Sequence, residues 1–182
     1  MKPLSPTKQK ILLLLFAGVA LSCAPTLGRQ ARVFKRAARE WKRIDEQALR
    51  TAIRDLYRSK LIDGKQNRDG THTFVLSEKG KKKALTYQFE TMKIEKKKWD
   101  GKWRFVCFDI PESLKSSRDA LRRKLLDVGF RELQKSMFVI PFECLSEIEF
   151  IIEYFRLRAH VRYGVIDAID NELHLKKMFE LS

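Results

Sequence analysis

The sequence predicts an α+β protein of two small domains, residues 1–95 and 98–182. In the first half, apolar residues recur at helical spacing and are followed by the sequence signal of a β-hairpin. In the second half, predicted strands alternate with predicted helices. The 182 residues, 44% of them hydrophobic, can form two small cores, because single domains usually hold about 100–150 residues. Between the halves, "KIEKKKWDGKW" is a charge run followed by Asp100-Gly101, which is typical of a linker or turn before a strand at about Trp103.

The positive charge of the chain is concentrated in its first half. The formal net charge is +15. Residues 1–98 contain 24 of the 38 Lys and Arg residues but only 9 of the 23 Asp and Glu residues, and the remainder contains 14 of each kind. Because phosphate contacts by Lys and Arg release condensed counterions, we expect the first half to bind a polyanion.

Cysteines and histidines are few and widely separated. Cys23, Cys107 and Cys144 form neither a disulfide framework nor a CxxC motif, and the three histidines lack the spacing of a zinc site. We therefore expect a cytoplasmic protein with reduced thiols and no required cofactor.

The first apolar segment has two interpretations. "KQKILLLLFAGVALSC" has a basic start and an apolar stretch from Ile11 to Leu21, which imitates a secretory or lipoprotein signal. The stretch is shorter than the about 20 apolar residues that span a bilayer, and the basic segment after it resists export. We therefore expect the buried first helix of a small domain, beginning at Ser5-Pro6-Thr7, and no membrane partner.

Two further helices are predicted in the first half, at about residues 29–42 and from an N-cap at Asp45 to about Lys60. One stripe of the third helix is apolar and consists of Leu49, Ala52, Ile53, Leu56 and Tyr57. Another face carries Gln47, Arg50, Arg54 and Arg58, and the three arginines, four residues apart, are stacked along one side.

A hairpin and a fourth helix complete the first half. Two short strands, about 61–66 and 71–76, flank a turn that ends in Asp69-Gly70, a strong tight-turn signal, and Ser77 can cap the next helix. Three helices and a basic-tipped hairpin in this order resemble a winged helix-turn-helix domain. The segment "LSEKGKKKAL" is similar to the one that leaves the wing in many such regulators.

This resemblance implies that the polyanion is double-stranded DNA. The third helix would enter the major groove, where Arg bonds guanine and Gln reads adenine, while the wing would reach phosphate or the minor groove. The predicted nucleic-acid-binding residues are Gln47, Arg50, Arg54 and Arg58 on the helix, with Lys65 and Arg68 on the wing. The alternative is that the arginines only solvate a helix face. The lysines of "KGKKK" are expected to be solvated or to touch phosphate.

The second half predicts a ferredoxin-like βαββαβ domain. "WRFVCFDI" is its first strand, a helix runs from Ser116 or Ser117 to a stop at Gly129, and "RELQKSMFVIPF" supplies one broken or two consecutive strands. Ser146 and Glu149 have the spacing of a capping box before the second helix. "VRYGVIDAI" is the last strand, and "NELHLKKMFEL" is a short amphipathic tail.

"KWDGKWRFVCFDIPES" and "RDALRRKLLDVGFRELQKSMFVIPF" resemble the central domain of the PaaX-type repressors of phenylacetate catabolism, over about residues 98–170. That domain is itself similar to the small CRISPR-associated ferredoxin-fold endoribonuclease of the spacer-acquisition complex. In the repressors a winged helix precedes the central domain. The resemblance therefore implies a homodimeric transcription regulator, in which the first domain binds DNA and the second pairs. The apolar run from Met137 to Phe142 is consistent with a strand covered on both sides.

The competing function is a metal-dependent endonuclease, or a spacer-acquisition subunit with a CRISPR integrase as partner. In the CRISPR nuclease family, an aspartate matched here by Asp109 comes from both chains of a dimer to hold one divalent metal ion. Mg²⁺ takes oxygen ligands and can activate water beside a phosphodiester. Asp109 is thus the candidate catalytic and metal-binding residue. The alternative, which we favour, is that Asp109 bonds backbone amides in the turn before Pro111.

Overall fold

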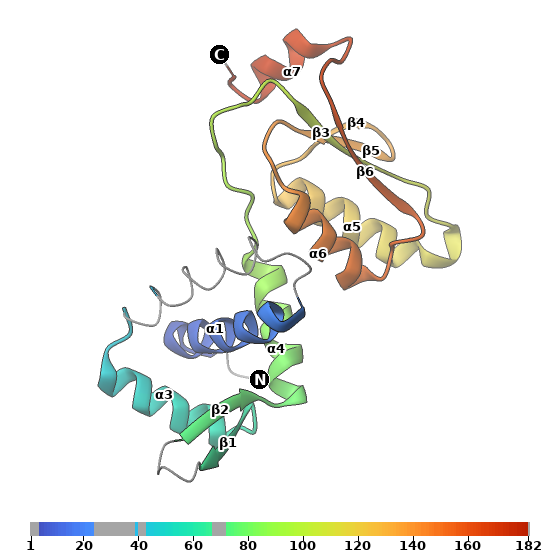
Figure 1. Cartoon of the computed structure of the whole chain (residues 1–182). Helices are drawn as coiled ribbons and strands as arrows, with labels where there is room; N and C mark the ends of the chain where they lie inside the picture. Colours follow the sequence, from blue (N-terminus) through green and yellow to red (C-terminus); the bar gives the residue numbers. More distant parts are fainter. Residues whose placement is uncertain (1–3, 24–38, 40–42, 67–71, 182) are drawn as a thin grey trace. The chain divides into compact units, whose positions relative to one another are not determined.

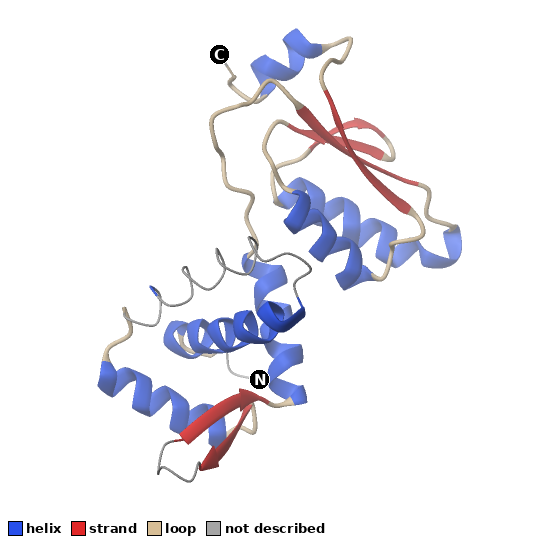
Figure 2. Cartoon of the chain, viewed as in Figure 1, coloured by secondary structure: helices blue, strands red, loops and turns tan. Residues whose placement is uncertain are grey.

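The computed structural model describes residues 4–23, 39, 43–66 and 72–181 (Figures 1 and 2). The chain divides into two compact units, Met1–Thr91 and Met92–Ser182. Each unit combines helices with one antiparallel sheet, so the protein is α+β, as predicted. Residues 92–102 between the last helix of the first unit and the first strand of the second form neither helix nor strand.

The first unit packs three described helices around an antiparallel hairpin. Its elements are α1 (Pro6–Cys23), α3 (Glu46–Arg58), β1 (Ile62–Gln66), β2 (His72–Leu76) and α4 (Glu78–Thr91). Helix α1 contacts both α3 and α4 (Figure 1). The predicted second helix, residues 29–42, lies outside the described residues except for Arg39, which is helical.

Helix α1 supplies the centre of the first unit's core. The side chains of Ile11 and Leu12 are fully buried and belong to one cluster with Leu56 of α3 and Ala84 of α4. This burial is what the interpretation as a buried first helix predicts. Among the described helices, none combines the length and the apolar character that crossing a bilayer requires.

The second unit contains a four-stranded sheet with helices inserted between its strands. Its elements are β3 (Trp103–Phe108), a 3₁₀ turn (Glu112–Leu114), α5 (Lys115–Asp127), β4 (Arg131–Gln134), β5 (Met137–Ile140), α6 (Leu145–Phe155), β6 (Val161–Ile166) and α7 (Glu172–Met178). The strand order in the sheet is β4-β5-β3-β6, and all neighbouring strands are antiparallel. Of the two alternatives for residues 131–142, the structure therefore has two consecutive strands.

The two faces of this sheet are covered differently. Helices α5 and α6 lie side by side on one face (Figure 1), towards which the buried side chains of Val106 and Phe138 point. Because side chains alternate along a strand, Trp103 and Val139 belong to the opposite face, where both are fully buried in a cluster with Leu175 of α7. Strand β5 is thus covered on both sides, as predicted, and α7 of the same chain covers part of the second side.

The segment before β3 is fixed to the second unit by an aromatic cluster. The ring centroid of Trp99 lies 5.2 Å from that of Trp103, and the Lys176 ammonium lies 4.9 Å from the Trp99 centroid. The Trp99 indole N–H also donates to the Lys102 carbonyl, at 3.0 Å. Helix α7 and the end of the linker therefore hold each other in place.

A buried arginine completes this attachment. Arg104 has only 4% of its side chain exposed, and its guanidinium donates to both carboxylate oxygens of Asp100, at 2.6 and 2.5 Å. It also donates to the carbonyl of Pro141, at 2.9 Å. The Arg104 side chain holds the pKa of Asp100 down to about 2. The Asp100-Gly101 turn is therefore a fixed corner rather than a solvated linker.

The end of α5 follows the prediction. Gly129 adopts a positive φ of 104°, its N–H donates to the Leu126 carbonyl, and the Phe130 N–H donates to the Leu125 carbonyl, at 3.1 and 3.0 Å. This pair of bonds is the Schellman motif, in which glycine avoids the strain that a Cβ would cause. The helix begins at Lys115, slightly earlier than predicted, because the 3₁₀ turn leads directly into it.

The start of α6 contradicts the predicted capping box. The helix already begins at Leu145, and the Ser146 hydroxyl donates to the neighbouring Glu147 carboxylate rather than capping the helix. The N-cap position belongs to Cys144, which makes no side-chain cap bond, and the carboxylate of the preceding Glu143 accepts the Leu145 N–H, at 3.3 Å. The prediction for Ser146 and Glu149 is therefore wrong.

Candidate nucleic-acid interface

Helix α3 begins where the sequence predicts. The Asp45 carboxylate accepts a hydrogen bond from the Ala48 N–H, at 2.9 Å, and so satisfies one of the free donors of the first turn. A carboxylate also interacts favourably with the positive end of the helix dipole. The cap fixes the position of the helix from its first turn.

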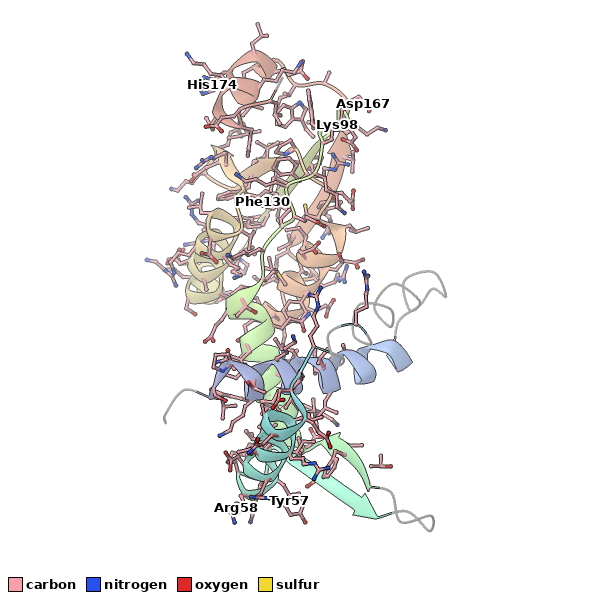
Figure 3. All side chains as sticks on the ribbon, turned by 90° about the vertical axis from the view of Figure 1, so that its left-hand side faces the viewer. Tyr57, Arg58, Lys98, Phe130, Asp167 and His174 are labelled. Atoms are coloured by element: carbon pink, nitrogen blue, oxygen red, sulfur yellow. The ribbon has the colours of Figure 1, made fainter. Side chains whose placement is uncertain are left out.

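The buried and exposed faces of α3 agree with the predicted division, with one exception. Ala52 and Leu56 are buried in the core. The four polar residues predicted for the other face, Gln47, Arg50, Arg54 and Arg58, are all exposed. Tyr57 was assigned to the apolar stripe but is 55% exposed, and it lies beside Arg58 at the end of α3 (Figure 3). Its place on the helix is intermediate between the two faces, so spacing alone could not decide it.

The three arginines differ in their ion pairs. Arg50 is held by Glu46 on the preceding turn, with 2.6 Å between the guanidinium and the carboxylate. Arg54 and Arg58 have no carboxylate partner among the residues that the structure describes. The nearby Asp55 is paired with Lys8 of α1, at 2.6 Å, and this hydrogen bond is the main reason why its pKa is lowered. Arg54 and Arg58 attract Asp55 only at longer range, which contributes to its lowered pKa, and neither forms an ion pair within the described residues.

Two further polar side chains near this face were not singled out from the sequence. Thr51 is exposed on α3 between Gln47 and Arg54, and Lys60 is exposed just after the helix. Lys60 has a φ of 55°, which lets the chain turn sharply from α3 into β1. Thr51 carries no charge and so does not extend the arginine row, and a lysine in a turn is common. Neither residue was therefore recognisable from the sequence as a candidate for DNA binding.

The predicted wing residues are only partly described. The backbone of Lys65 lies in β1 opposite Thr73. Its side chain, and Arg68 altogether, lie outside the described residues.

Asp109, the candidate metal ligand, directly follows β3 and is exposed. Its backbone N–H donates to the His160 carbonyl, at 3.0 Å. Among the described residues its carboxylate has no hydrogen-bond partner, so it does not hold the turn as we expected. That role belongs to Arg118 of α5, which donates to the Ile110 carbonyl and to the Glu112 carboxylate, at 3.2 and 2.8 Å.

The surroundings of Asp109 do not form a metal site within one chain. An open pocket of about 570 Å³ beside it is lined by Cys107, Phe108, Asp109, Gln134, Ser136, Met137, Ala159, His160 and Arg162. In the described part of the chain, no group of three His, Cys, Asp or Glu side chains could hold a metal ion. Glu112, the other acid of the motif, is paired with Arg118, which lowers its pKa. A divalent ion such as Mg²⁺ needs more oxygen ligands than one free carboxylate.

The comparison with protein families concerns the second unit. Residues 96–175 match the family described as the PaaX protein central Cas2-like domain. This part of the chain is therefore similar to a PaaX-type central domain. A search of curated proteins gave no match to the chain.

The matched range includes the contacts that attach the linker to the second unit. It begins at Lys96, before Trp99 and Asp100, and ends at Leu175 within α7. The bonded pair of Asp100 and Arg104 and most of the aromatic cluster therefore lie inside the matched range rather than in a connection outside it.

Proposed function

We propose that the chain is a PaaX-type transcription regulator, which binds double-stranded DNA through its first unit and forms a homodimer through its second. The observation that carries the proposal is the exposed face of α3. There Arg54 and Arg58 have no carboxylate partner among the described residues, beside the exposed side chains of Gln47 and Thr51. These residue types bond base edges and phosphates in the major groove.

The order of elements supports a winged helix-turn-helix for the first unit and a ferredoxin-like domain for the second. In the first unit α3 is followed directly by the β1-β2 hairpin and then by α4. We assign α3 as the recognition helix, because it directly precedes the hairpin and its exposed face carries Gln47, Arg54 and Arg58. In the second unit the strand-helix-strand-strand-helix-strand order, with the sheet order β4-β5-β3-β6, fits the split βαβ plan.

Dimerisation would use the sheet face opposite α5 and α6. Phe105, Cys107 and Met137 belong to this face by their register, and all three are half-buried. None of them belongs to the cluster beneath α7. A two-fold dimer would present two copies of α3 to two half-sites about one helical turn of DNA apart.

Replacement of Arg54 by alanine tests DNA recognition. We expect Arg54→Ala to weaken binding to a preferred duplex by about 1–3 kcal/mol, which corresponds to roughly 5- to 150-fold in Kd, because a bidentate base contact is lost. The duplex is obtained by selection with the wild-type chain from a random-sequence pool. Binding is measured by fluorescence anisotropy at several salt concentrations.

Asp109→Ala is the matched control, because it removes an exposed charge from the second unit. It should leave DNA affinity unchanged. An Arg54→Ala chain with wild-type affinity would contradict the assignment of α3. Cleavage of RNA or DNA that requires Mg²⁺ or Mn²⁺ and is abolished by Asp109→Ala would instead support the nuclease.

A further inference from the structure

The first turn of α4 is attached directly to the end of α3. The Ser77 hydroxyl donates to the Lys60 carbonyl, at 2.8 Å, and accepts the Gly80 N–H, at 3.0 Å. The Ser77 N–H donates to the Leu61 carbonyl, at 3.1 Å. These bonds fix where the side chains of α4 lie relative to the last turn of α3.

Gly80 allows this close approach. A Cβ at this position would lie 1.9 Å from the Leu61 carbonyl oxygen, which belongs to the backbone and cannot move aside easily. The side chain next to it, Lys79, reaches the last turn of α3, and its ammonium donates to the Ser59 carbonyl, at 3.2 Å. The first turn of α4 therefore meets the chain that directly follows α3, Ser59 to Leu61, with almost no space between the Gly80 and Leu61 backbones.

The surface at this junction carries positive charge. We call Lys60, Lys79 and Lys82 the junction cluster; all three are exposed. Lys82 lies one turn beyond Lys79 on the same side of α4. Glu78, the nearest acid in the sequence of α4, forms its ion pair with Lys81, at 2.6 Å, and also attracts Lys82 more weakly. The junction cluster thus lies at the C-terminal end of α3, the end that also carries Arg58.

The dimensions of α3 and of DNA suggest what this surface meets. Helix α3 has 13 residues and is therefore about 20 Å long. The major groove is only about 12 Å wide. If α3 enters the groove with its N-terminal end first, so that residues near Gln47 and Arg54 read base edges, its last turn lies near the sugar-phosphate backbone at the side of the groove.

We propose that the junction cluster is a phosphate-binding surface, which contacts the DNA backbone flanking the bases read by α3. The proposal rests on the proposed DNA-binding function and extends it to residues outside α3 and the hairpin. Lys79 can serve both purposes, because an ammonium has three donors and the Ser59 carbonyl takes one of them. Lysine contacts to phosphate position a protein on DNA without reading its sequence.

The double variant Lys79→Gln/Lys82→Gln tests this surface. The slope of log K against log salt changes by about 0.9 for each phosphate contact on duplex DNA. We therefore expect the slope to become shallower by about one to two. The affinity should fall by the same factor for the preferred duplex and for a scrambled duplex, so that their ratio is unchanged. Anisotropy titrations of both duplexes between low and physiological salt measure these quantities.

Two further variants distinguish the loss of local phosphate contacts from a loss of folding and from a change in net charge. Lys135→Gln/Lys177→Gln removes the same charge from exposed positions of the second unit and should keep the wild-type slope. Lys82→Glu leaves the Lys79 bond to α3 intact, so it should weaken both duplexes even if Lys79→Gln disturbs the first unit. Far-UV circular dichroism checks that each variant is folded.

The outcomes distinguish this inference from the proposed function. If Arg54→Ala weakens preferred binding but the junction variants keep the wild-type slope, the junction cluster does not contact phosphate and the recognition role of α3 stands. An equal loss of slope in the Lys135→Gln/Lys177→Gln control would also overturn the inference. If the wild-type chain binds no duplex, both proposals fall.

Discussion

At the scale of single residues, the Asp100–Arg104 pair is the contact with the clearest pH dependence. Arg104 is almost completely buried, whereas about half of the Asp100 side chain is exposed. Removal of the carboxylate would leave a buried guanidinium that bonds carbonyl oxygens and, at 3.3 Å, Glu143. Water screens the exposed half of the pair, so its contribution is smaller than that of a fully buried ion pair.

We predict that Asp100→Asn lowers the free energy of unfolding of the second unit by about 1–2 kcal/mol at pH 7. The pKa of Asp100 is about 2 in the folded chain and near 3.8 otherwise. The ion pair therefore makes its full contribution to the free energy of unfolding above about pH 4, and this contribution is lost as the pH falls through 2. Urea unfolding of wild type and variant at several pH values should show the difference shrinking in this window.

Asp167→Asn is the comparison for this measurement. Asp167 and Lys102 form an exposed pair with 3.5 Å between their charged groups, and such pairs contribute little to stability. The Asp167 variant should therefore unfold like the wild type. A penalty for Asp100→Asn that stays constant down to pH 2 would show that the ion pair is not its cause.

Single residues also show how far local sequence signals reach. Asp45 and Gly129 were predicted correctly, because a cap and a positive-φ glycine depend on their immediate neighbours. The burial of Arg104 was not predicted, because an arginine in a strand is normally exposed and its partners Pro141 and Glu143 are distant in sequence. Asp109 was assigned a local role that a residue from α5, Arg118, performs instead.

At the scale of elements, the joint between α3 and α4 depends on one glycine. We predict that Gly80→Ala destabilises the first unit by about 2 kcal/mol. Alanine favours a helix over glycine by only about 1 kcal/mol, whereas a methyl group 1.9 Å from the Leu61 carbonyl oxygen forces the backbone apart and typically costs 1–3 kcal/mol or more. Urea unfolding followed by far-UV circular dichroism measures the change.

Gly18→Ala makes the same substitution in α1, where an added Cβ meets nothing within 4 Å. That variant should be as stable as the wild type or more stable, by up to about 1 kcal/mol. Equal stability of the two variants would contradict the close approach at Gly80. The sequence predicted Ser77 as a helix cap and a helix after it. It could not reveal that this helix contacts the chain at the end of α3, because that contact depends on how the hairpin folds back.

At the scale of the whole molecule, the sequence predicted the order of helices and strands better than it predicted which elements pack against each other. The spacing of apolar residues indicated the described helices and strands, because the buried face of a helix or strand places apolar residues at a regular interval. It could not say what covers a strand that is apolar on both sides. The run from Met137 to Phe142 predicts a strand covered on both sides, and in the structure α7 covers Val139. The part of that sheet face around Met137 is what remains for a partner copy.

Dimerisation and DNA affinity should therefore fail together when this remaining face is charged. We predict that Met137→Arg makes the chain monomeric in sedimentation equilibrium at concentrations where the wild type is a dimer. Linking two binding sites raises affinity by about 10²–10⁴. The variant should accordingly lose about a hundredfold in affinity for a duplex with two half-sites, but keep the wild-type affinity for a single half-site.

Val165→Arg is the matched control, because Val165 is 47% exposed in the same sheet but pairs with Arg104 and so belongs to the face of α5 and α6. It should leave both the mass and the DNA affinity unchanged. If Met137→Arg instead remains a dimer, the second unit pairs through another surface. If it becomes a monomer that still prefers two half-sites, the two copies of α3 are not held by the PaaX-type domain, and the division of labour between the units is wrong.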